Sequence, residues 1–419
     1  MRGKSLKSRI KSIIILTTLL VGGTGLVACN SGKDNGKYSP IAISKIDNQN
    51  STEAVVSKEY ENLTFSEDFR VEFPDITSFS SFAMTLKPFV SPQETYEQFA
   101  AAVELYFPDT FTEEEKKEQC QVTGEDANGE IIRGTYASLA HKLESIDKDI
   151  AMLLISDKGT IQTFGCGYTY TATGTTAYSL DHPEGGTVGM YIAADDNTIV
   201  EKIFIPQGGV EEERVYPLLD GEVKLTDAIA YTEEFFKNEF DRGIANPELT
   251  PEVCEAWVVD MGDGIYGYHL VMTPTYQQIR FDAQPMNRAG SFGTQGVRNS
   301  KDYANFPGYA FTIENGKLDA IMIVGGKLAY DITPGKTCTE MITAEQATEI
   351  LSESVSGHAG LVIERAEFLY APYREVVGDG SVLTVDAVWR FVGRNKNDGF
   401  RYLFYVNAVT GELDYYKYS

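Results

Sequence analysis

Few side chains in this sequence could do chemistry, and their spacing limits what that chemistry is. The chain has 419 residues, with only four His and five Cys. His141, His182, His269 and His358 lie far apart, and none forms a His-x-x-x-His pair or stands next to a Cys. A structural zinc site needs such clustering. Because there is also no P-loop, we expect neither a metal nor another cofactor.

Three short motifs match parts of catalytic patterns, and each lacks its companions. Cys166 lies between two glycines that could expose a nucleophilic thiol, but its neighbours are Thr and Tyr rather than cations or a helix N-terminus. Ser145-x-x-Lys148 matches one motif of penicillin-recognising enzymes without the other two. Residues 262–267 spell Gly-x-Gly-x-x-Gly, yet a strand pattern follows instead of a phosphate-binding helix. We therefore predict that the protein has no catalytic site.

Cys29 is the cysteine whose setting predicts a definite modification. Residues 1–28 carry five cationic side chains, then an apolar run, then small residues, which is the form of an export signal. The segment before the cysteine resembles the lipobox of bacterial lipoproteins. Its residues are Leu26, Val27 and Ala28. We expect residues 1–28 to be a signal peptide that is removed, and Cys29 to accept diacylglycerol.

The lipobox resemblance implies a protein on the extracytoplasmic face of the cell membrane, because a diacyl thioether with any further acyl chain gives stable anchoring. The other cysteines, Cys120, Cys166, Cys254 and Cys338, would then lie in an oxidising compartment. Their even number allows three disulfide pairings. A chain of this length can also bury four unpaired thiols. The spacing leaves both alternatives open.

The charge of the chain excludes a nucleic-acid partner. It has 36 basic and 61 acidic residues and a net charge of −25, whereas phosphate binding needs clustered Lys and Arg. The signal peptide holds five of the positive charges and no negative ones, so the mature protein is more acidic still and is repelled by anionic headgroups. No later segment has 18 consecutive apolar residues. We therefore expect the lipid anchor to be its membrane contact.

Three amphipathic segments predict the helices that organise the chain. The first begins at Ser91 and ends near residue 108, with Pro and Glu at the positions that favour a helix start. The second begins at Thr226 and runs to about residue 240. The third begins at Thr343, has Gln346 in the capping-box position and stops before residue 357.

Strand patterns follow the last two helices and predict a repeat. The two tryptophans of the chain, Trp257 and Trp389, each lie in an apolar run that leads to an Asp-Gly turn and then to a second run rich in Tyr. The distance from the helix start to the tryptophan is 15 residues longer in the second unit. We attribute this difference to a longer loop over residues 372–380, where extra length is tolerated best.

These elements predict an α+β fold of two or three modules, each a helix packed on an antiparallel sheet, after a lipidated flexible tether. The predicted signal peptide covers residues 1–28, and the tether, rich in Ser, Asn and Gly, covers 29–58. An N-terminal α+β domain covers 59–215, with a hairpin over 150–170 and a strand over 198–205. The middle module covers 216–335 and the C-terminal module 336–419.

The C-terminal region resembles the PepSY family. The resemblance rests on residues 389–391, Trp-Arg-Phe, and on residues 405–413, Tyr-Val-Asn-Ala-Val-Thr-Gly-Glu-Leu. PepSY modules commonly end in a hydrophobic strand and a turn of this kind. In such a turn Gly411 can take a positive φ, while Asn407 and Thr410 can hydrogen-bond local backbone groups. The middle region resembles the family more faintly.

The PepSY resemblance implies a noncatalytic role outside the cytoplasm, because the family occurs in protease propeptides and in membrane-associated regulatory proteins. We therefore expect a binding or regulatory lipoprotein whose partner is an envelope protein, peptide or glycan. One alternative is a surface glycan- or peptide-binding lipoprotein that uses the Tyr-rich strands. Another is a hydrolase with a noncontiguous site, for which Cys166 is the first residue to test.

Overall fold

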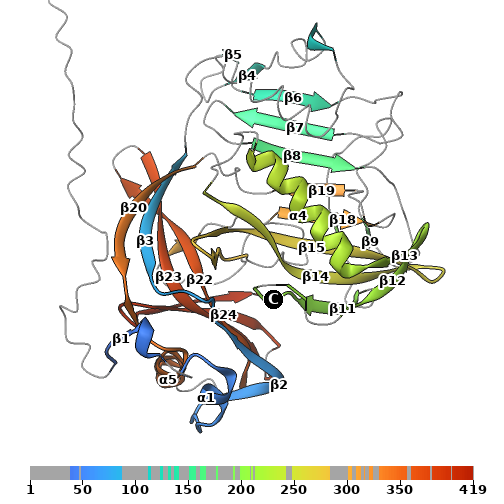
Figure 1. Cartoon of the computed structure of the whole chain (residues 1–419). Coiled ribbons are helices and arrows are strands. Elements are labelled where there is room, and N and C mark those ends of the chain that lie inside the picture. The colour runs from blue at the N-terminus through green and yellow to red at the C-terminus, as the bar shows by residue number, and fades with distance from the viewer. Residues whose placement is uncertain are drawn as a thin grey trace, which may run out of the picture.

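Strands dominate the computed structural model, which contains two large sheets and a few helices (Figure 1). The structure describes residues 38–86, 199–283 and 301–418 apart from short gaps, together with residues 112–114 and short strands between 123 and 193. All the described strand pairs are antiparallel except one, between β2 (Leu63–Glu72) and β22 (Leu361–Val377). The predicted mixture of helices and antiparallel sheets is confirmed.

We name the larger sheet the β14 sheet. Across it lie β11 (Ile199–Phe204), β14 (Thr250–Gly262), β15 (Ile265–Tyr276), β18 (Gly308–Thr312), β19 (Ala320–Ile323), β8 (Ile161–Cys166), β7 (Ala151–Ser156) and β6 (Tyr136–Ala140), with β16 (Ile279–Arg280) beside β15. The predicted hairpin over residues 150–170 and the predicted strand over 198–205 are confirmed as β7, β8 and β11. The turn from β14 to β15 has a positive φ at both Asp263 and Gly264, as an Asp-Gly hairpin requires.

We name the other large sheet the β22 sheet. Its strands are β17 (Asp302–Tyr303), β22, β23 (Gly380–Asn395), β24 (Arg401–Asn407) and β25 (Leu413–Tyr418), joined by β2, β3 (Phe79–Leu86) and β20 (Tyr330–Cys338). The long β22–β23 hairpin is its centre. One edge of β23 pairs with β3 over residues 383–385 and with β24 over residues 388–394. The sheet therefore divides into two branches along β23.

Shorter elements lie around these sheets. The small strand pairs are β1 (Ile41–Ala42) with β21 (Glu340–Met341), β4 (Thr123–Glu125) with β5 (Ile131–Arg133), β9 (Thr176–Ala177) with β10 (Ile192–Ala193), and β12 (Val215–Leu218) with β13 (Gly221–Lys224). The helices are η1 (Ile43–Lys45), α1 (Thr52–Val56), α4 (Leu225–Asp241) and α5 (Ala344–Ser354). Figure 1 shows α4 across one face of the β14 sheet and α5, with α1, against the β22 sheet.

Two of the three predicted helices are confirmed as α4 and α5. At α5, Thr343 Oγ1 accepts a hydrogen bond from the Gln346 amide at 3.2 Å, and the Gln346 side chain accepts one from the Thr343 amide at 3.0 Å. This is the capping box that the sequence predicted. The predicted helix over residues 91–108 lies outside the described residues.

The predicted correspondence between the two tryptophans is wrong. Trp257 lies on β14, the first strand after α4, whereas Trp389 lies on β23, the second strand after α5. The 15 additional residues belong to strand β22, not to a loop over 372–380. Pro372 is tolerated in β22 because it lies between the stretch that pairs with β2 and the stretch that pairs with β17. The Asp-Gly turn belongs to the first hairpin after α4 but to the second hairpin after α5, so the shared turn signal did not mark equivalent hairpins.

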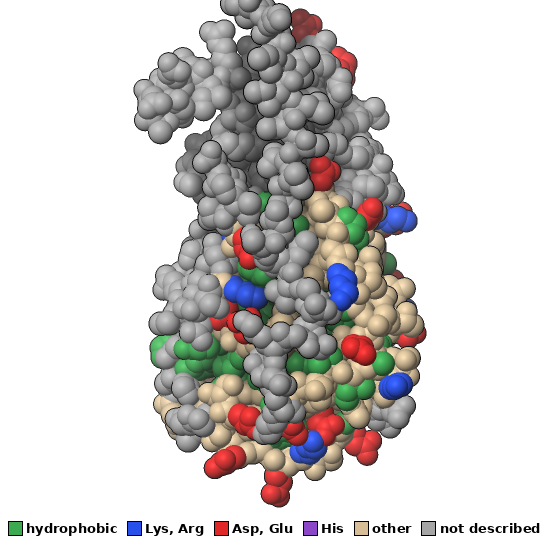
Figure 2. All heavy atoms as spheres, turned by 90° about the vertical axis from the view of Figure 1, so that its left-hand side faces the viewer, with side chains coloured by type: hydrophobic (Ala, Val, Ile, Leu, Met, Phe, Trp, Pro, Cys, Tyr) green, Lys and Arg blue, Asp and Glu red, His purple; other side chains and the backbone are tan. Residues whose placement is uncertain are grey.

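The N-terminal boundaries also differ from the prediction. Residues 41–58, which the sequence placed in the tether, include β1, paired with β21, and α1, whose N-cap Ser51 accepts a hydrogen bond from Ala54. Lys58 forms ion pairs with Glu345 and Glu349 of α5, so this segment belongs to the folded body. Figure 2 shows acidic side chains gathered at this end of the molecule. Among the described residues, β2 and β3 pair into the β22 sheet, and β8 and β11 pair into the β14 sheet.

The turn between β24 and β25 has the structure that its residues predicted. Asn407 Oδ1 accepts hydrogen bonds from the amides of Val409 and Thr410, both at 2.9 Å. Thr410 Oγ1 accepts one from the Glu412 amide at 3.2 Å, and Gly411 has a φ of 71°. The turn also contacts α5, because a Cβ on Gly411 would lie 3.1 Å from Cδ1 of Ile350. The turn therefore packs directly against the helix.

We expect Gly411→Ala to lower the free energy of unfolding more than Gly399→Ala. Both glycines have a φ near 70°, so each alanine incurs the left-handed penalty of about 1–2 kcal/mol. A Cβ at position 399 meets nothing within 4 Å, while one at position 411 meets Ile342 Cδ1 at 2.9 Å and must displace it. Urea unfolding of the two variants isolates this contact. Equal losses would show that the turn does not press on Ile342 and Ile350.

Candidate functional site

A buried arginine joins the two sheets. Arg390 of β23 is only 5% exposed, and its guanidinium forms ion pairs with Asp282 and with Glu367. Glu367 lies on the adjacent strand β22, whereas Asp282 is the second residue after β16 of the β14 sheet. Arg390 also donates to the Ala283 carbonyl at 3.1 Å, and Tyr405 donates to Asp282 Oδ2 at 2.7 Å. One cation therefore takes its counter-ions from both sheets.

Glu367 is held in its charged form by two arginines. Burial alone would raise the pKa of this carboxyl, but the guanidinium groups of Arg365 and Arg390 outweigh burial and lower the pKa to about 2. Arg365 Nε donates to Glu367 Oε2 at 2.8 Å. The ion pairs thus run from Arg390 in the interior of the sheet interface, through Glu367, to the more exposed Arg365.

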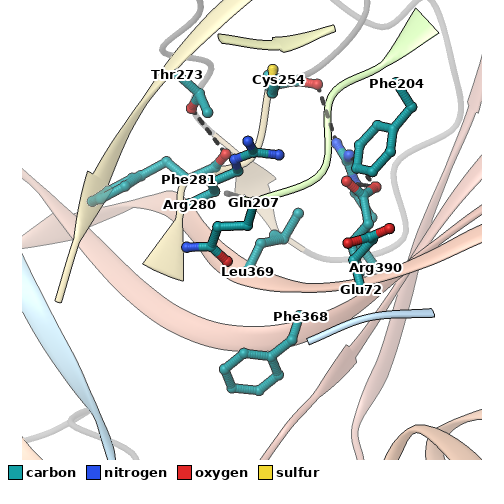
Figure 3. Close-up of a pocket in the computed structure, with 12 residues that line it drawn as sticks. Glu72, Phe204, Gln207, Cys254, Thr273, Arg280, Phe281, Phe368, Leu369 and Arg390 are labelled. Carbon is teal, nitrogen blue, oxygen red and sulfur yellow. Dashed lines mark hydrogen bonds and ion pairs between the residues drawn. The ribbon is translucent and has the colours of Figure 1, made fainter. Parts of the chain in front are cut away.

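A small cavity lies beside this network. Arg280 at its wall donates to the Ile205 carbonyl at 2.6 Å and pairs with Glu252 at 2.5 Å. Figure 3 shows Glu72, Phe204 and Arg390 on one side of the cavity and Arg280 with Cys254 on the other. Its volume is about 30 Å³, which fits one or two water molecules and no larger ligand.

A much larger groove opens on the other side of Phe204, with a volume of about 650 Å³. We name it the Phe204 groove. Among the residues that the structure describes, Phe204 is the one that lines both the groove and the small cavity. Four consecutive residues of β11 line one wall, and alternate residues of β2 line the other. The complete lining is Ser66, Asp68, Arg70, Glu201, Lys202, Ile203, Phe204, Pro206, Val210, Arg214, Glu364, Arg365 and Val392.

Irregular strand pairing shapes the Phe204 groove. The register between β2 and β22 shifts between Phe65 and Arg70, and the register between β22 and β23 shifts at the same point of β22, next to Glu364. Such bulges bend a strand and redirect its side chains. Beyond the shift, Arg70 and Arg365 are direct partners on neighbouring strands. Both guanidinium groups lie near the ring of Phe204, at 5.9 Å and 4.2 Å from its centroid.

The cysteines that the sequence analysis singled out do not gather in this region. Cys29 and its lipobox, Leu26 to Ala28, lie outside the described residues, as does Cys120. Cys166 ends strand β8, and its side chain is not described. Cys338 is disulfide-bonded whereas Cys254 is free, so the four cysteines are neither all unpaired nor all paired with one another. Cys254 is free and buried, and burial raises the pKa of its thiol to about 12, which opposes nucleophilic chemistry.

The remaining candidate motifs are structural where they are described. Burial, together with the nearby charge of Lys202, lowers the pKa of His269 to about 3, so its imidazole is neutral at physiological pH. Residues 262–267 form the β14–β15 hairpin, and Ser145-x-x-Lys148 lies outside the described residues. Within the described part of the chain, no three His, Cys, Asp or Glu side chains are arranged to hold a metal ion. No described helix is long and apolar enough to span a membrane.

No sequence motif predicted the residues that build the Phe204 groove and the buried network that supports it. Asp282 and Arg390 are 108 positions apart, and no local pattern links them. Arg70 and Arg365 become neighbours only through the parallel pairing of β2 with β22. The one signal was Arg390 itself, a charged residue between Trp389 and Phe391 in an apolar strand, because such a charge needs a buried counter-ion.

Comparison with known proteins assigns no family to the chain. Neither a protein-family model nor a curated protein matches the sequence.

We expect Glu367→Gln to lower the free energy of unfolding at pH 7 by about 3–5 kcal/mol, because it leaves Arg390 and Arg365 short of a buried counter-ion. The difference from the wild type should shrink as the pH falls. The folded-state pKa of Glu367 is about 2, below the ordinary glutamate pKa of 4.5, so its contribution is present above pH 4.5 and declines as the pH falls toward 2. Chemical unfolding at pH 7 and pH 3 measures both values.

The exposed carboxylate of Glu59 provides the matched control. Glu59→Gln removes a carboxylate without uncovering a buried cation, and we expect it to change the free energy of unfolding by less than about 0.5 kcal/mol at either pH. If Glu367→Gln behaves like Glu59→Gln at pH 7, the buried network does not hold the sheets together.

Proposed function

We propose that the protein is a noncatalytic lipoprotein, anchored through Cys29 to the extracytoplasmic face of the cell membrane, which binds a partner of the envelope in the Phe204 groove. The observation that carries this proposal is the groove itself. Its volume of about 650 Å³ lies within the range of ligand sites. Its walls come from both sheets, and the buried pairs of Arg390 fix those walls relative to each other.

The state of the buried reactive groups supports a binding role. A nucleophilic cysteine needs a lowered pKa, and a general base needs a pKa near the working pH. The pKa of Cys254 is raised and that of His269 is lowered, each by burial. Arg390 and Glu367, the other groups with strongly shifted pKa values in this region, are bound to each other. Each of these groups is therefore in a state that suits a structural role better than catalysis.

We propose further that the chain contains two PepSY-like modules, α4 with β14, β15, β18 and β19, and α5 with β22, β23, β24 and β25. Two similarities support the pairing of these elements. A glycine with a positive φ follows the third strand of each set, Gly316 in one and Gly411 in the other. On each second strand a buried aromatic donates a hydrogen bond to a carbonyl just before the helix, Tyr268 to Val223 and Trp389 to Ile342.

The alternative of a glycan-binding surface is less well supported. Such a surface needs exposed aromatic side chains, but Tyr268, Tyr402 and Tyr405 on the Tyr-rich strands are all buried. Tyr405 also donates to Asp282 in the buried network. A peptide remains a fitting ligand class, since the Phe204 groove is bordered by a strand edge. A hydrolase with Cys166 in a noncontiguous site stays an alternative for direct assay.

We expect metabolic labelling with palmitate to mark the wild type and not Cys29→Ser, because the thiol is the acceptor of the lipid. The variant should leave the membrane fraction and, if still exported, enter the medium. Immunoblotting of both fractions measures this. Label retained on Cys29→Ser would contradict anchoring through this residue.

We expect the full mature lipoprotein to capture an envelope component that Ser66→Trp fails to capture. Ser66 lines the Phe204 groove, and an indole there fills space that a ligand would need. Ser57→Trp, on an exposed residue at the end of α1, is the matched control and should capture as the wild type does. Affinity capture from detergent-solubilised envelopes, followed by mass spectrometry and repeated with glycan competitors, makes the comparison. Capture unaffected by Ser66→Trp would contradict binding in the groove.

A further inference from the structure

Two arginines of the Phe204 groove lie side by side, and of the two only Arg365 forms an ion pair with a described carboxylate. Arg70 and Arg365 are direct partners on β2 and β22, a placement in which like charges repel. Glu367 binds the Nε of Arg365 at 2.8 Å and is itself shared with Arg390. Arg70 is exposed and forms no ion pair with any residue that the structure describes. An anion bound between the two guanidinium groups would remove this repulsion.

The chemistry of these two side chains favours a carboxylate as that anion. A guanidinium is planar and offers paired N–H donors that match a carboxylate in a bidentate arrangement. The ring of Phe204 lies within 6 Å of both guanidinium groups, which is close enough for a cation–π attraction. The groove carries four cationic side chains against three acidic ones, in a chain whose net charge is −25. The local excess of positive charge is therefore a property of this groove and not of the surface as a whole.

The wall opposite Arg70 is the edge of a sheet. β11 pairs with β14 on one side and lies at the end of the strand order of the described β14 sheet. Residues 201–204 line the groove consecutively, whereas a strand that presents a face contributes alternate residues, as β2 does. The backbone of β11 is thus directed into the groove. An extended peptide can pair with such an edge through its own backbone.

We propose that the Phe204 groove binds a short acidic segment of an envelope protein, which extends along β11 and places a carboxylate between Arg70 and Arg365. This inference rests on the proposed function and names the ligand class of the same groove. The strand edge supplies affinity through backbone hydrogen bonds, and the arginine pair selects for an acidic side chain. A partner without a carboxylate at this point of the strand leaves Arg70 without an ion pair and leaves its repulsion from Arg365 in place.

The test uses the full mature lipoprotein in detergent and a short fluorescent peptide of alternating Glu and Thr. Fluorescence anisotropy should show that the wild type binds this peptide, and that the same peptide with Gln in place of Glu binds at least about tenfold more weakly, the loss expected for one charge-assisted hydrogen bond. Arg70→Gln should weaken binding of the Glu peptide by a similar factor. The affinity of Arg70→Lys for the Glu peptide should lie between those of the wild type and Arg70→Gln, because lysine keeps the charge and loses the bidentate geometry.

Arg374→Gln is the matched control, since Arg374 is an exposed arginine on the same strand β22 and does not line the groove. Binding by Arg374→Gln should equal that of the wild type. Equal affinity for the Glu and Gln peptides, or for the wild type and Arg70→Gln, would overturn the proposal. Displacement of the peptide by a sulfated glycan or by vesicles of phosphatidylglycerol, in the absence of any preference for Glu over Gln, would assign the groove to one of those anions instead.

The failure of this inference is distinguishable from the failure of the proposed function. Suppose that Ser66→Trp abolishes capture of an envelope component while Arg70→Gln leaves both that capture and peptide binding unchanged. The groove then binds a partner, but the inference that this partner is an acidic segment is wrong. If Ser66→Trp leaves capture unchanged as well, the binding role of the groove itself is wrong.

Discussion

The buried charge of Arg390 is the constraint on which the docking of the two sheets depends. Its guanidinium leaves water on folding, and its two described counter-ions, Asp282 from the β14 side and Glu367 from the β22 sheet, compensate for that loss together with the Ala283 carbonyl. A buried ion pair need not make a fold more stable than apolar packing would, but leaving one partner unpaired costs several kcal/mol. Any other relative position of the sheets would separate Arg390 from Asp282. The network therefore selects one arrangement among the many that apolar contact alone would allow.

The Phe204 groove follows from that arrangement. Phe204 lies on β11 of the β14 sheet, whereas Arg365 lies on β22. The guanidinium carbon of Arg365 is 4.2 Å from the centroid of the Phe204 ring. Arg365 is positioned from behind by Glu367, the same carboxylate that binds Arg390. The groove wall and the sheet junction thus share one residue. The register shift at Glu364 adds the bend in β22 that turns this part of the strand toward the groove.

The local features of the fold could be predicted from the sequence, while its long-range pairings could not. Thr343 with Gln346 marks a helix start, and Asp263-Gly264 marks a hairpin, because each interaction lies within a few residues. Ser51 was placed in a flexible tether, since the Ser- and Asn-rich composition typical of tethers also supplies helix caps. The pairing of β2 with β22 joins residues about 300 positions apart, and no periodicity within either strand records its partner. The arginine pair of the groove, which depends on that pairing, was beyond prediction for the same reason.

The strong negative charge of the chain affects how the groove would discriminate between ligands. At a distance, a net charge of −25 repels any acidic segment, and the Debye length of about 8 Å at physiological salt limits the reach of that repulsion. A carboxylate that enters the groove lies within contact distance of Arg70 and Arg365, where bulk salt screens the interaction less. Acidic molecules that cannot enter the groove therefore meet mainly repulsion, whereas an extended segment that pairs with β11 reaches the two guanidinium groups. The acidic surface and the arginine pair act in opposite directions, and their combination restricts binding to anions with a shape that fits along the strand edge.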